Sequence, residues 1–319
     1  MSSELKSMHM GQVTSFFIPT VTLVGQGCSK EIPNRLKSIG GAKPLIVTDK
    51  GIVACGVLKQ VTDILDAGGV NYAIYDETVP NPTDKNVEAA TAAYNDNKCD
   101  SLISIGGGSS HDCAKGVGFV VGNGGKIHDY EGVDKSSKPF PPYIAVNTTA
   151  GTASEMTRFC IITDTSRKVK MAIVDWRCTP SVAIDDPVLM MGMPPALTAA
   201  TGMDALTHAV EAYVSTAATP MTDACKKRPW NTSTVTCAAQ LPTAQTRKPV
   251  KACAMPSTSP AWPSTTQAWV TCTPWLTSSA ASTTCPMANA TPSSCPTSAN
   301  TTVSPAAAAS AASPNSLAN

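Results

Sequence analysis

The chain has 319 residues, enough for two domains that each bury a hydrophobic core, and its formal charge is only +1. A charge so close to zero argues against the strongly basic proteins that hold nucleic acid or anionic membranes through phosphate contacts. The first residues lack a basic segment followed by an apolar one, and no eighteen consecutive residues are apolar. We therefore expect a cytoplasmic protein with neither a nucleic acid nor a membrane as partner.

The composition changes abruptly close to residue 225. All acidic residues lie at or before Asp223, and all glycines lie at or before Gly202. Residues 226–319 consist mainly of Ser, Thr, Ala and Pro and contain no histidine. Such low complexity is typical of linkers or glycosylated stalks, but those rarely carry the five Cys and four Trp found here. Residues 1–225 and 226–319 therefore need separate interpretations.

Residues 1–225 alternate between short apolar runs and stretches with helical periodicity, which predicts an α/β fold built on a parallel sheet. Strands are predicted at residues 20–24, 45–48, 72–75, 99–105, 143–146, 159–162 and 169–174. Helices are predicted at residues 28–39 and 57–65, from Thr83 or Asp84 onward, after the glycines at 106–108, and from Pro194-Pro195 onward. This order predicts an α/β domain at residues 1–187 and the start of an all-helical domain at residues 188–225.

The segment Gly106-Gly107-Gly108-Ser109 stands between a predicted strand and a predicted helix. Glycine lets a phosphate approach the backbone closely, and the free N–H groups and positive end of the following helix attract it. The segment therefore suits a dinucleotide pyrophosphate, although it lacks the GxGxxG pattern of the common Rossmann fingerprint. A tight strand-to-helix turn without a ligand is the alternative.

Two other segments that follow predicted strands carry polar groups. A carboxylate at Asp49 can accept hydrogen bonds from both ribose hydroxyls of NAD and would repel the 2′-phosphate of NADP; a helix cap is the alternative. The segment 148–155, with the sequence TTAGTASE, gathers hydroxyl groups around a glycine. It suits hydrogen bonding to a nicotinamide ribose or phosphate, and an ordinary Ser/Thr-rich turn is the alternative.

Asp204 and His208 are four residues apart in a predicted helix, so their side chains emerge from one face. An oxygen and a nitrogen ligand at that spacing can bind one divalent cation. A hydrogen-bonded pair without a metal is the alternative.

These segments occur in a recognisable order: Asp49 at a strand end, the 106–109 segment with Asp112, the 148–155 segment, Asp186-Pro187, and GMDALTHAVE at residues 202–211. Together they closely resemble the iron-dependent, or group III, alcohol dehydrogenases. The resemblance covers residues 12–225. It implies an N-terminal dinucleotide-binding α/β domain followed by an all-helical domain, with a metal in the cleft.

The resemblance also implies roles for individual residues. NAD is the implied cofactor, and the residues implied to bind it are Asp49, Asn81, Gly107, Gly108, Ser109, Thr148, Thr149, Thr152 and Lys170. Asp204 and His208 are implied as two of four metal ligands, with Fe²⁺ as the expected ion and Zn²⁺ as the alternative. The implied reaction is hydride transfer between NAD and a primary alcohol or diol, or its aldehyde, and an intact relative would be a homo-oligomer.

In the family, two histidines from later helices complete the metal site, but the histidines of this sequence stand at positions 9, 111, 128 and 208. Residues 284–295 can be back-translated so that a one-base displacement yields Leu-Pro-His-Gly-Glu-Cys-Asn-Ala-Ile-Leu-Leu. Residues 270–277 likewise yield Tyr-Val-His-Ala-Met-Ala-His, and both products resemble family segments. We therefore expect residues 226–319 to be a frameshifted, non-native tail.

Three functions follow from these observations. The first is an iron-dependent alcohol dehydrogenase by lineage, whose activity the two missing ligands would impair. The second is an NAD-binding remnant without catalytic activity. The third is a zinc-dependent enzyme similar to glycerol dehydrogenase.

Overall fold

The structure is a computed structural model that describes residues 17–215. The chain divides into two compact units, residues 1–281 and 282–319, and all described residues lie in the first. The strands are β1 (Val21–Val24), β2 (Pro44–Val47), β3 (Ala73–Tyr75), β4 (Ser101–Gly106), β5 (Gly132–Val133), β6 (Tyr143–Asn147), β7 (Phe159–Asp164), β8 (Val169–Val174) and β9 (Val182–Asp185). The α-helices are α2 (Ile32–Ser38), α3 (Lys50–Ala54), α4 (Val57–Ala67), α5 (Asp84–Asp96), α6 (Gly108–Asn123), α7 (Pro187–Met190) and α8 (Pro195–Val214), and the short 3₁₀ helices are η1 (Cys28–Glu31), η2 (Ile127–Tyr130), η3 (Ser154–Met156) and η4 (Trp176–Cys178).

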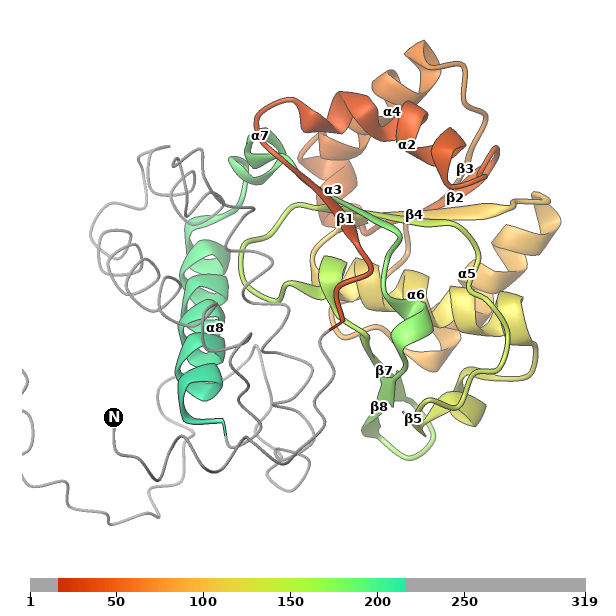
Figure 1. The fold of residues 1–319 in the computed structure, drawn as a ribbon, viewed down its shortest axis with the longest axis vertical. Helices are drawn as coiled ribbons and strands as arrows, with labels where there is room; N and C mark the ends of the chain where they lie inside the picture. The colour runs from red at the N-terminus through yellow and green to blue at the C-terminus, as the bar shows by residue number, and fades with distance from the viewer. Residues whose placement is uncertain (1–16, 216–319) are drawn as a thin grey trace, which may run out of the picture. The chain divides into compact units, whose positions relative to one another are not determined.

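A six-stranded parallel sheet with the strand order β1-β9-β6-β4-β2-β3 forms the centre of the fold. Side chains alternate between its two faces. Ile46 and Ile103 pack with α2 and α4 on one face, whereas Leu45 and Leu102 pack with α5 and α6 on the other. Figure 1 shows these two groups of helices on opposite sides of the sheet. The predicted α/β fold class with a parallel sheet is thus confirmed.

The beginnings of the helices have local causes. At α5, the Thr83 hydroxyl accepts a hydrogen bond from the Asn86 N–H while the Asn86 side-chain oxygen accepts one from the Thr83 N–H. This reciprocal arrangement satisfies two N–H groups that a helix otherwise leaves unpaired, so the cap is Thr83 rather than Asp84. The predicted helix at 28–39 begins as the tighter turn η1 and continues as α2.

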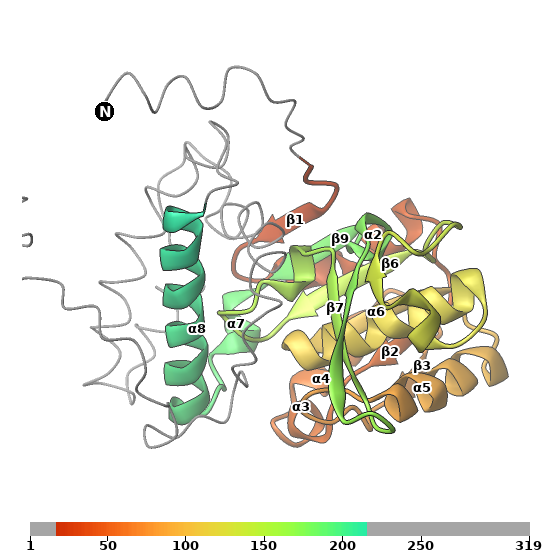
Figure 2. The ribbon, with the colours of Figure 1, turned by 90° about the horizontal axis from the view of Figure 1, so that it is seen from below.

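Two features of the sheet differ from the sequence prediction. Strands β7 and β8 pair antiparallel and belong with β5 to a separate three-stranded sheet, visible beside α6 in Figure 2. Only one face of this small sheet is well covered, because Cys160, Ile162, Met171 and Ile173 pack with Phe119 of α6. The sequence analysis also missed β9, a four-residue strand buried between β1 and β6.

The order of the strands creates a place for a ligand. The chain leaves β2 toward α3 and α4 on one face, whereas it leaves β4 toward α6 on the other face. In open α/β sheets, ligands bind at such a point, outside the carboxyl ends of the two strands. Asp49 and Gly106 to Gly108 follow β2 and β4 and so lie at this point. Among the described helices, none has the length and apolar character needed to cross a bilayer.

Candidate cofactor groove and metal-ligand pair

The three glycines that run from the last residue of β4 to the first residue of α6 leave the first N–H groups of α6 without a side-chain cap. Gly106 has φ of 152°, and a Cβ there would lie 2.3 Å from the Ser110 hydroxyl oxygen. Gly107 is the N-cap residue of α6 and provides no side-chain hydrogen bond to the helix. The positive end of a sixteen-residue helix therefore faces the switch point between β2 and β4, which is the geometry that binds phosphate.

The glycines also make room for the threonine loop that follows β6. A Cβ on Gly107 would lie 2.9 Å from the Thr149 side chain, and one on Gly108 would lie 3.2 Å from the Thr152 side chain. The sequence analysis explained glycine at 107 and 108 by the close approach of a phosphate. The structure adds a second reason, because a larger side chain at either position would crowd this loop. Thr148, next to them, is buried, and its hydroxyl oxygen has no hydrogen-bond partner. Such an orphaned polar atom suits a site that accepts a polar ligand.

Asn81, Ser109 and Lys170 come together although they are far apart in the sequence. The Asn81 N–H donates to the Ser109 hydroxyl over 3.3 Å, and the Lys170 ammonium donates to the Asn81 side-chain oxygen over 2.8 Å. Asn81 adopts the left-handed conformation, with φ of 57°, which asparagine tolerates better than most residues. The contact places a positive charge close to the start of α6, where it would favour an anionic ligand.

Asp49 carries out the structural role that sequence reasoning gave as its alternative, and it also touches the glycine turn. One carboxylate oxygen accepts the Ile52 N–H over 3.0 Å and caps α3. The other accepts the Ser110 hydroxyl over 3.3 Å. The cap and the position beside β4 are compatible with a ribose-binding role, because a carboxylate has about four acceptor sites.

Two charged residues of α6 hold the threonine loop in place, and the sequence analysis gave neither a role. The buried ammonium group of Lys115 donates to the carbonyl oxygens of Ser154, Thr157 and Phe159 over 2.7, 2.9 and 2.7 Å. Asp112 accepts hydrogen bonds from the Ser154 hydroxyl and the Ile161 N–H. The detectable signal was an Asp and a Lys three residues apart in a helix whose other residues carry no carboxylate or ammonium group.

A buried pair of acids is formed by Glu155 of η3 and Asp185 at the end of β9. Burial, and secondly the charge of Asp185, raise the pKa of Glu155 well above its usual value, while burial raises the pKa of Asp185 to about 6. One oxygen of Asp185 accepts from the Asn147 side chain over 3.2 Å. Neither Glu155 oxygen has a hydrogen-bond partner. Burial without a hydrogen-bond partner therefore favours the neutral form of the Glu155 carboxyl, which sequence reasoning did not anticipate.

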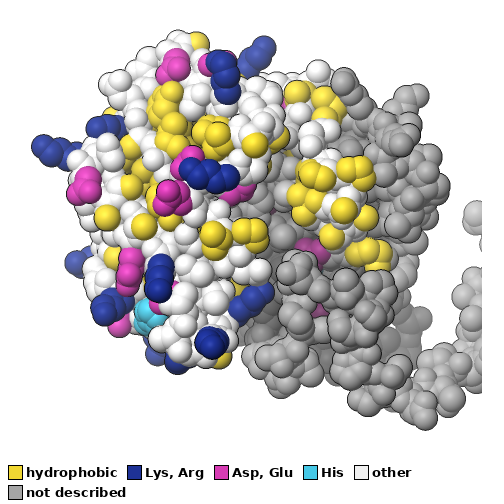
Figure 3. All heavy atoms as spheres, turned by 180° about the vertical axis from the view of Figure 1, so that it is seen from behind, with side chains coloured by type: hydrophobic (Ala, Val, Ile, Leu, Met, Phe, Trp, Pro, Cys, Tyr) yellow, Lys and Arg dark blue, Asp and Glu magenta, His cyan; other side chains and the backbone are white. Residues whose placement is uncertain are grey.

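Asp204 and His208 lie one turn apart on α8, as predicted. The Asp204 Oδ1 and His208 Nε2 atoms are 3.6 Å apart, and the other ring nitrogen of His208 is buried without a hydrogen-bond partner. Burial opposes protonation of His208, but hydrogen bonding and the charge of Asp204 outweigh it and raise the pKa of the imidazole. Elsewhere on α8, Leu197, Met203 and Val210 are exposed, and Figure 3 shows hydrophobic groups at the surface of the face hidden in Figure 1.

The carboxylate oxygen and imidazole nitrogen of this pair form a donor set that suits Fe²⁺ or Zn²⁺. Within residues 17–215, however, no third His, Cys, Asp or Glu side chain joins Asp204 and His208 in a group able to hold an ion. A catalytic metal normally has at least three protein ligands. Within the described residues, Asp204 and His208 alone therefore fall short of that number.

Comparison with known proteins agrees with this arrangement. The family model described as iron-containing alcohol dehydrogenase matches residues 19–187, and the model of the C-terminal part of the same family matches residues 198–238. The second match ends thirteen residues beyond Cys225, where the sequence resemblance was expected to stop.

Individual relatives point to the same family. Alcohol dehydrogenase 4 of Schizosaccharomyces pombe is 56% identical over 213 residues, which are 67% of this chain and 50% of the relative. The NAD-dependent methanol dehydrogenase of Bacillus methanolicus is 50% identical over 212 residues, 66% of this chain and 56% of that protein. A solved structure of 1,3-propanediol oxidoreductase aligns with a TM-score of 0.76 at 39% identity, covering 82% of this chain and 66% of the other.

This chain spans about half the length of the curated relatives it matches. The first family model covers more than half of the chain, and its match includes the glycine turn, the threonine loop and Asp49. The chain therefore belongs to the iron-containing alcohol dehydrogenase family.

Proposed function

We propose that this chain binds NAD at the carboxyl ends of β2, β4 and β6 and derives from an enzyme that transfers hydride between NAD and a primary alcohol or diol, or its aldehyde. The observation that carries the proposal is the convergence of four separate segments on the start of α6. Thr149 and Thr152 contact the glycines, Asp49 contacts Ser110, and Lys170 reaches Ser109 through Asn81.

Different residues of the groove would bind different parts of the cofactor. The N–H groups of Gly108 and Ser109 and the ammonium group of Lys170 would bind the pyrophosphate, while Asp49 would accept the ribose hydroxyls and exclude NADP by charge repulsion. The hydroxyls of Thr148, Thr149 and Thr152 would hold the nicotinamide side. These residues would hold the nicotinamide ring in one orientation toward a substrate, which is the main contribution a protein makes to hydride transfer.

Asp204 and His208 would hold the metal. Divalent iron, or zinc in the alternative similar to glycerol dehydrogenase, supplies Lewis acidity toward the substrate oxygen when bound. Because the pair provides two ligands, the full enzyme needs further ligands from outside residues 17–215. The homo-oligomeric state and the cytoplasmic location expected from the sequence belong to the same proposal.

A second candidate function is an NAD-binding remnant without turnover. Two observations favour it: no third ligand joins Asp204 and His208 within the described residues, and no histidine follows His208 in the sequence. In this view residues 1–187 form the NAD-binding domain, residues 188–225 begin the helical domain, and residues 226–319 are read in a displaced frame. Those last residues lie outside the described part of the chain.

One experiment separates the two functions. The full chain is titrated with NADH by fluorescence, and NADH formation is followed with a panel of primary alcohols and diols in the presence of Fe²⁺ or Zn²⁺. Cofactor binding with turnover supports the dehydrogenase, and cofactor binding without turnover supports the remnant. Failure to bind NADH would contradict both. Resequencing the gene around codon 225, and assaying the product of the displaced frame, tests the frameshift itself.

A further inference from the structure

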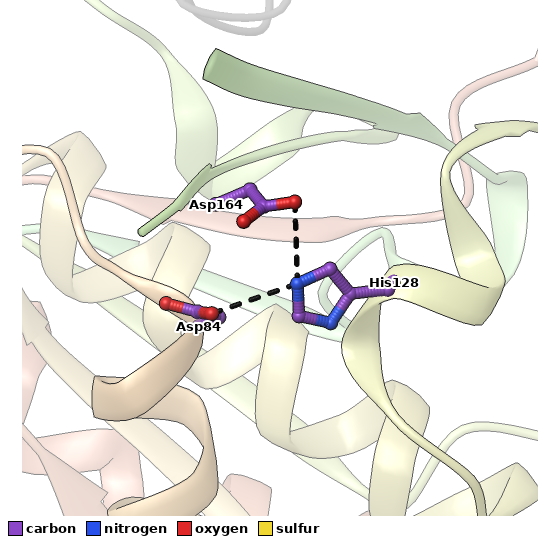
Figure 4. Close-up of side chains that lie close together, drawn as sticks. All are labelled: Asp84, His128 and Asp164. Atoms are coloured by element: carbon purple, nitrogen blue, oxygen red, sulfur yellow. Dashed lines mark ion pairs between the residues drawn. The ribbon is translucent and has the colours of Figure 1, made fainter. Parts of the chain in front are cut away.

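A second group of metal-ligating side chains lies apart from the groove, on the small sheet side of the molecule. Asp84 comes from the first turn of α5, His128 from η2 and Asp164 from the end of β7. Figure 4 shows the three side chains pointing toward one another, with one ring nitrogen of His128 facing both carboxylates. Their ligand atoms all lie within 4.8 Å of one another.

The two distances from His128 to the carboxylates exceed those of hydrogen bonds and match the spacing of ligands around a shared cation. The His128 Nε2 atom is 3.5 Å from Asp84 Oδ2 and 3.4 Å from Asp164 Oδ2. Hydrogen bonds between N–H groups and oxygen measure about 2.7–3.2 Å. Two ligands at the bond lengths of tetrahedral zinc are about 3.3–3.6 Å apart. Both observed separations fall in that interval.

Both carboxylates are already oriented by neighbours that leave the cluster a net negative charge. Thr165 donates to Asp84 through its N–H and its hydroxyl, and Ser166 donates to Asp164 in the same two ways. Arg167 pairs with Asp164, but it also pairs with Glu131. Asp84, Asp164 and Glu131 carry three negative charges, and Arg167 carries one positive charge. The net charge of this group is therefore about −2 when His128 is neutral.

We propose that Asp84, His128 and Asp164 form a second metal site, selective for divalent ions of the zinc type. The imidazole nitrogen favours such ions over Mg²⁺ and Ca²⁺, which prefer oxygen ligands alone. The His128 side chain is 30% exposed, so water can supply a fourth ligand. The bound ion joins α5, η2 and β7 and thereby ties the small sheet to the helices of the main domain.

The test uses the full chain carrying His208→Asn, so that the proposed catalytic pair does not contribute. Zinc binding is measured by equilibrium dialysis with metal analysis, and cobalt binding by visible absorption. We expect one zinc per chain, and His128→Asn in the same background should weaken its affinity more than about 100-fold, since losing a ligand costs more than losing one of its hydrogen-bond partners. Because His208 is absent from every sample, the result is independent of the proposed function.

Controls separate this site from other sources of metal binding. Asp129→Asn removes a neighbouring carboxylate of η2 that lies outside the cluster and should leave zinc affinity unchanged. Bound cobalt should lack the near-ultraviolet charge-transfer band of a sulfur ligand. Each variant is compared in EDTA, where equal unfolding midpoints show that His128→Asn leaves the fold intact. Absence of zinc binding, or binding that His128→Asn leaves unchanged, would overturn the proposal.

Discussion

The groove at the ends of β2, β4 and β6 and the Asp204–His208 pair on α8 differ in how complete they are. The residues that the sequence analysis assigned to the groove lie on strands, helices and loops that pack against one another within the described domain. Several of these residues contact one another. The pair on α8 is positioned only by the geometry of one helix. A site built across several elements depends on the whole domain, whereas a pair four residues apart needs just one helical turn. Substitutions should therefore have large effects in the first region and small ones in the second.

The largest effect is expected for Lys115→Met, which removes three hydrogen bonds from a buried ammonium group to carbonyl oxygens. The carbonyl groups of Ser154, Thr157 and Phe159 would lose this donor inside the protein, although the Ser154 oxygen still accepts the Thr157 N–H over 3.3 Å. We expect a cost of about 4 kcal/mol in the free energy of unfolding. Urea denaturation measures this value. Lys85→Met, on the exposed side of α5, is the matched control and should cost under about 0.5 kcal/mol. Equal effects of the two variants would contradict the role of Lys115.

Gly106→Ala should destabilise the chain by about 3 kcal/mol and abolish detectable NADH binding. The new Cβ meets the Ser110 side chain and adopts a backbone conformation that alanine rarely tolerates. Gly124→Ala also has positive φ, but its Cβ would meet no atom within 4 Å. The difference between the two variants therefore measures the contact with Ser110, and NADH binding should persist in Gly124→Ala.

Acid should destabilise the domain through His111. Burial, and secondly the charge of Lys115, lower the pKa of this imidazole to about 3 from its usual value of 6.5. The unfolded chain thus binds a proton between pH 6.5 and pH 3 that the folded chain does not, so stability falls as the pH drops through this window. At pH 5 the loss is about 2 kcal/mol relative to pH 7.5.

Other groups titrate in the same range, including Asp185, so the wild-type profile alone does not isolate His111. His111→Asn keeps a polar group near Ser104, whose hydroxyl lies 2.7 Å from the His111 ring. The difference in unfolding free energy between wild type and variant should shrink as the pH falls. A difference that stays constant from pH 7.5 to pH 5 would show that His111 does not carry this effect.

Asp49→Asn should lower NADH affinity about tenfold and reduce the preference for NADH over NADPH, because the charge that repels the 2′-phosphate is lost. The asparagine side chain can still cap α3, so the unfolding midpoint should change little. Fluorescence titration with both cofactors measures the ratio. Asp63→Asn, which removes an exposed carboxylate paired with Lys59 on α4, is the control.

The smallest effect is expected for Asp204→Asn. The pair with His208 is partly exposed, and its loss should change the free energy of unfolding by about 0.5 kcal/mol. In the product of the displaced reading frame, the same substitution should abolish iron retention, measured by metal analysis. A large stability loss in the present chain would show that α8 depends on the pair more than its geometry indicates.

Local patterns in the sequence determined most of the individual elements. The alternation of apolar runs with helical stretches predicted the α/β class. The beginning of α5 was predicted at Thr83 or Asp84, and the structure shows that Thr83 is the cap. The glycine segment, the threonine segment and Asp49 were each predicted at a strand end, where they are found. These features follow from propensity, capping and strand ends, which depend on neighbouring residues.

Only the tertiary structure decided which of these segments meet. It placed β9 between β1 and β6, because the pairing of strands far apart in the chain leaves no local pattern in the sequence. It also placed the β7–β8 hairpin with β5 in a separate sheet. It also showed that Lys115 holds the threonine loop and that His128 lies between Asp84 and Asp164. A lone lysine or histidine in a sequence has no visible partner, since hydrogen bonds and metal ligation require closeness in space rather than in sequence.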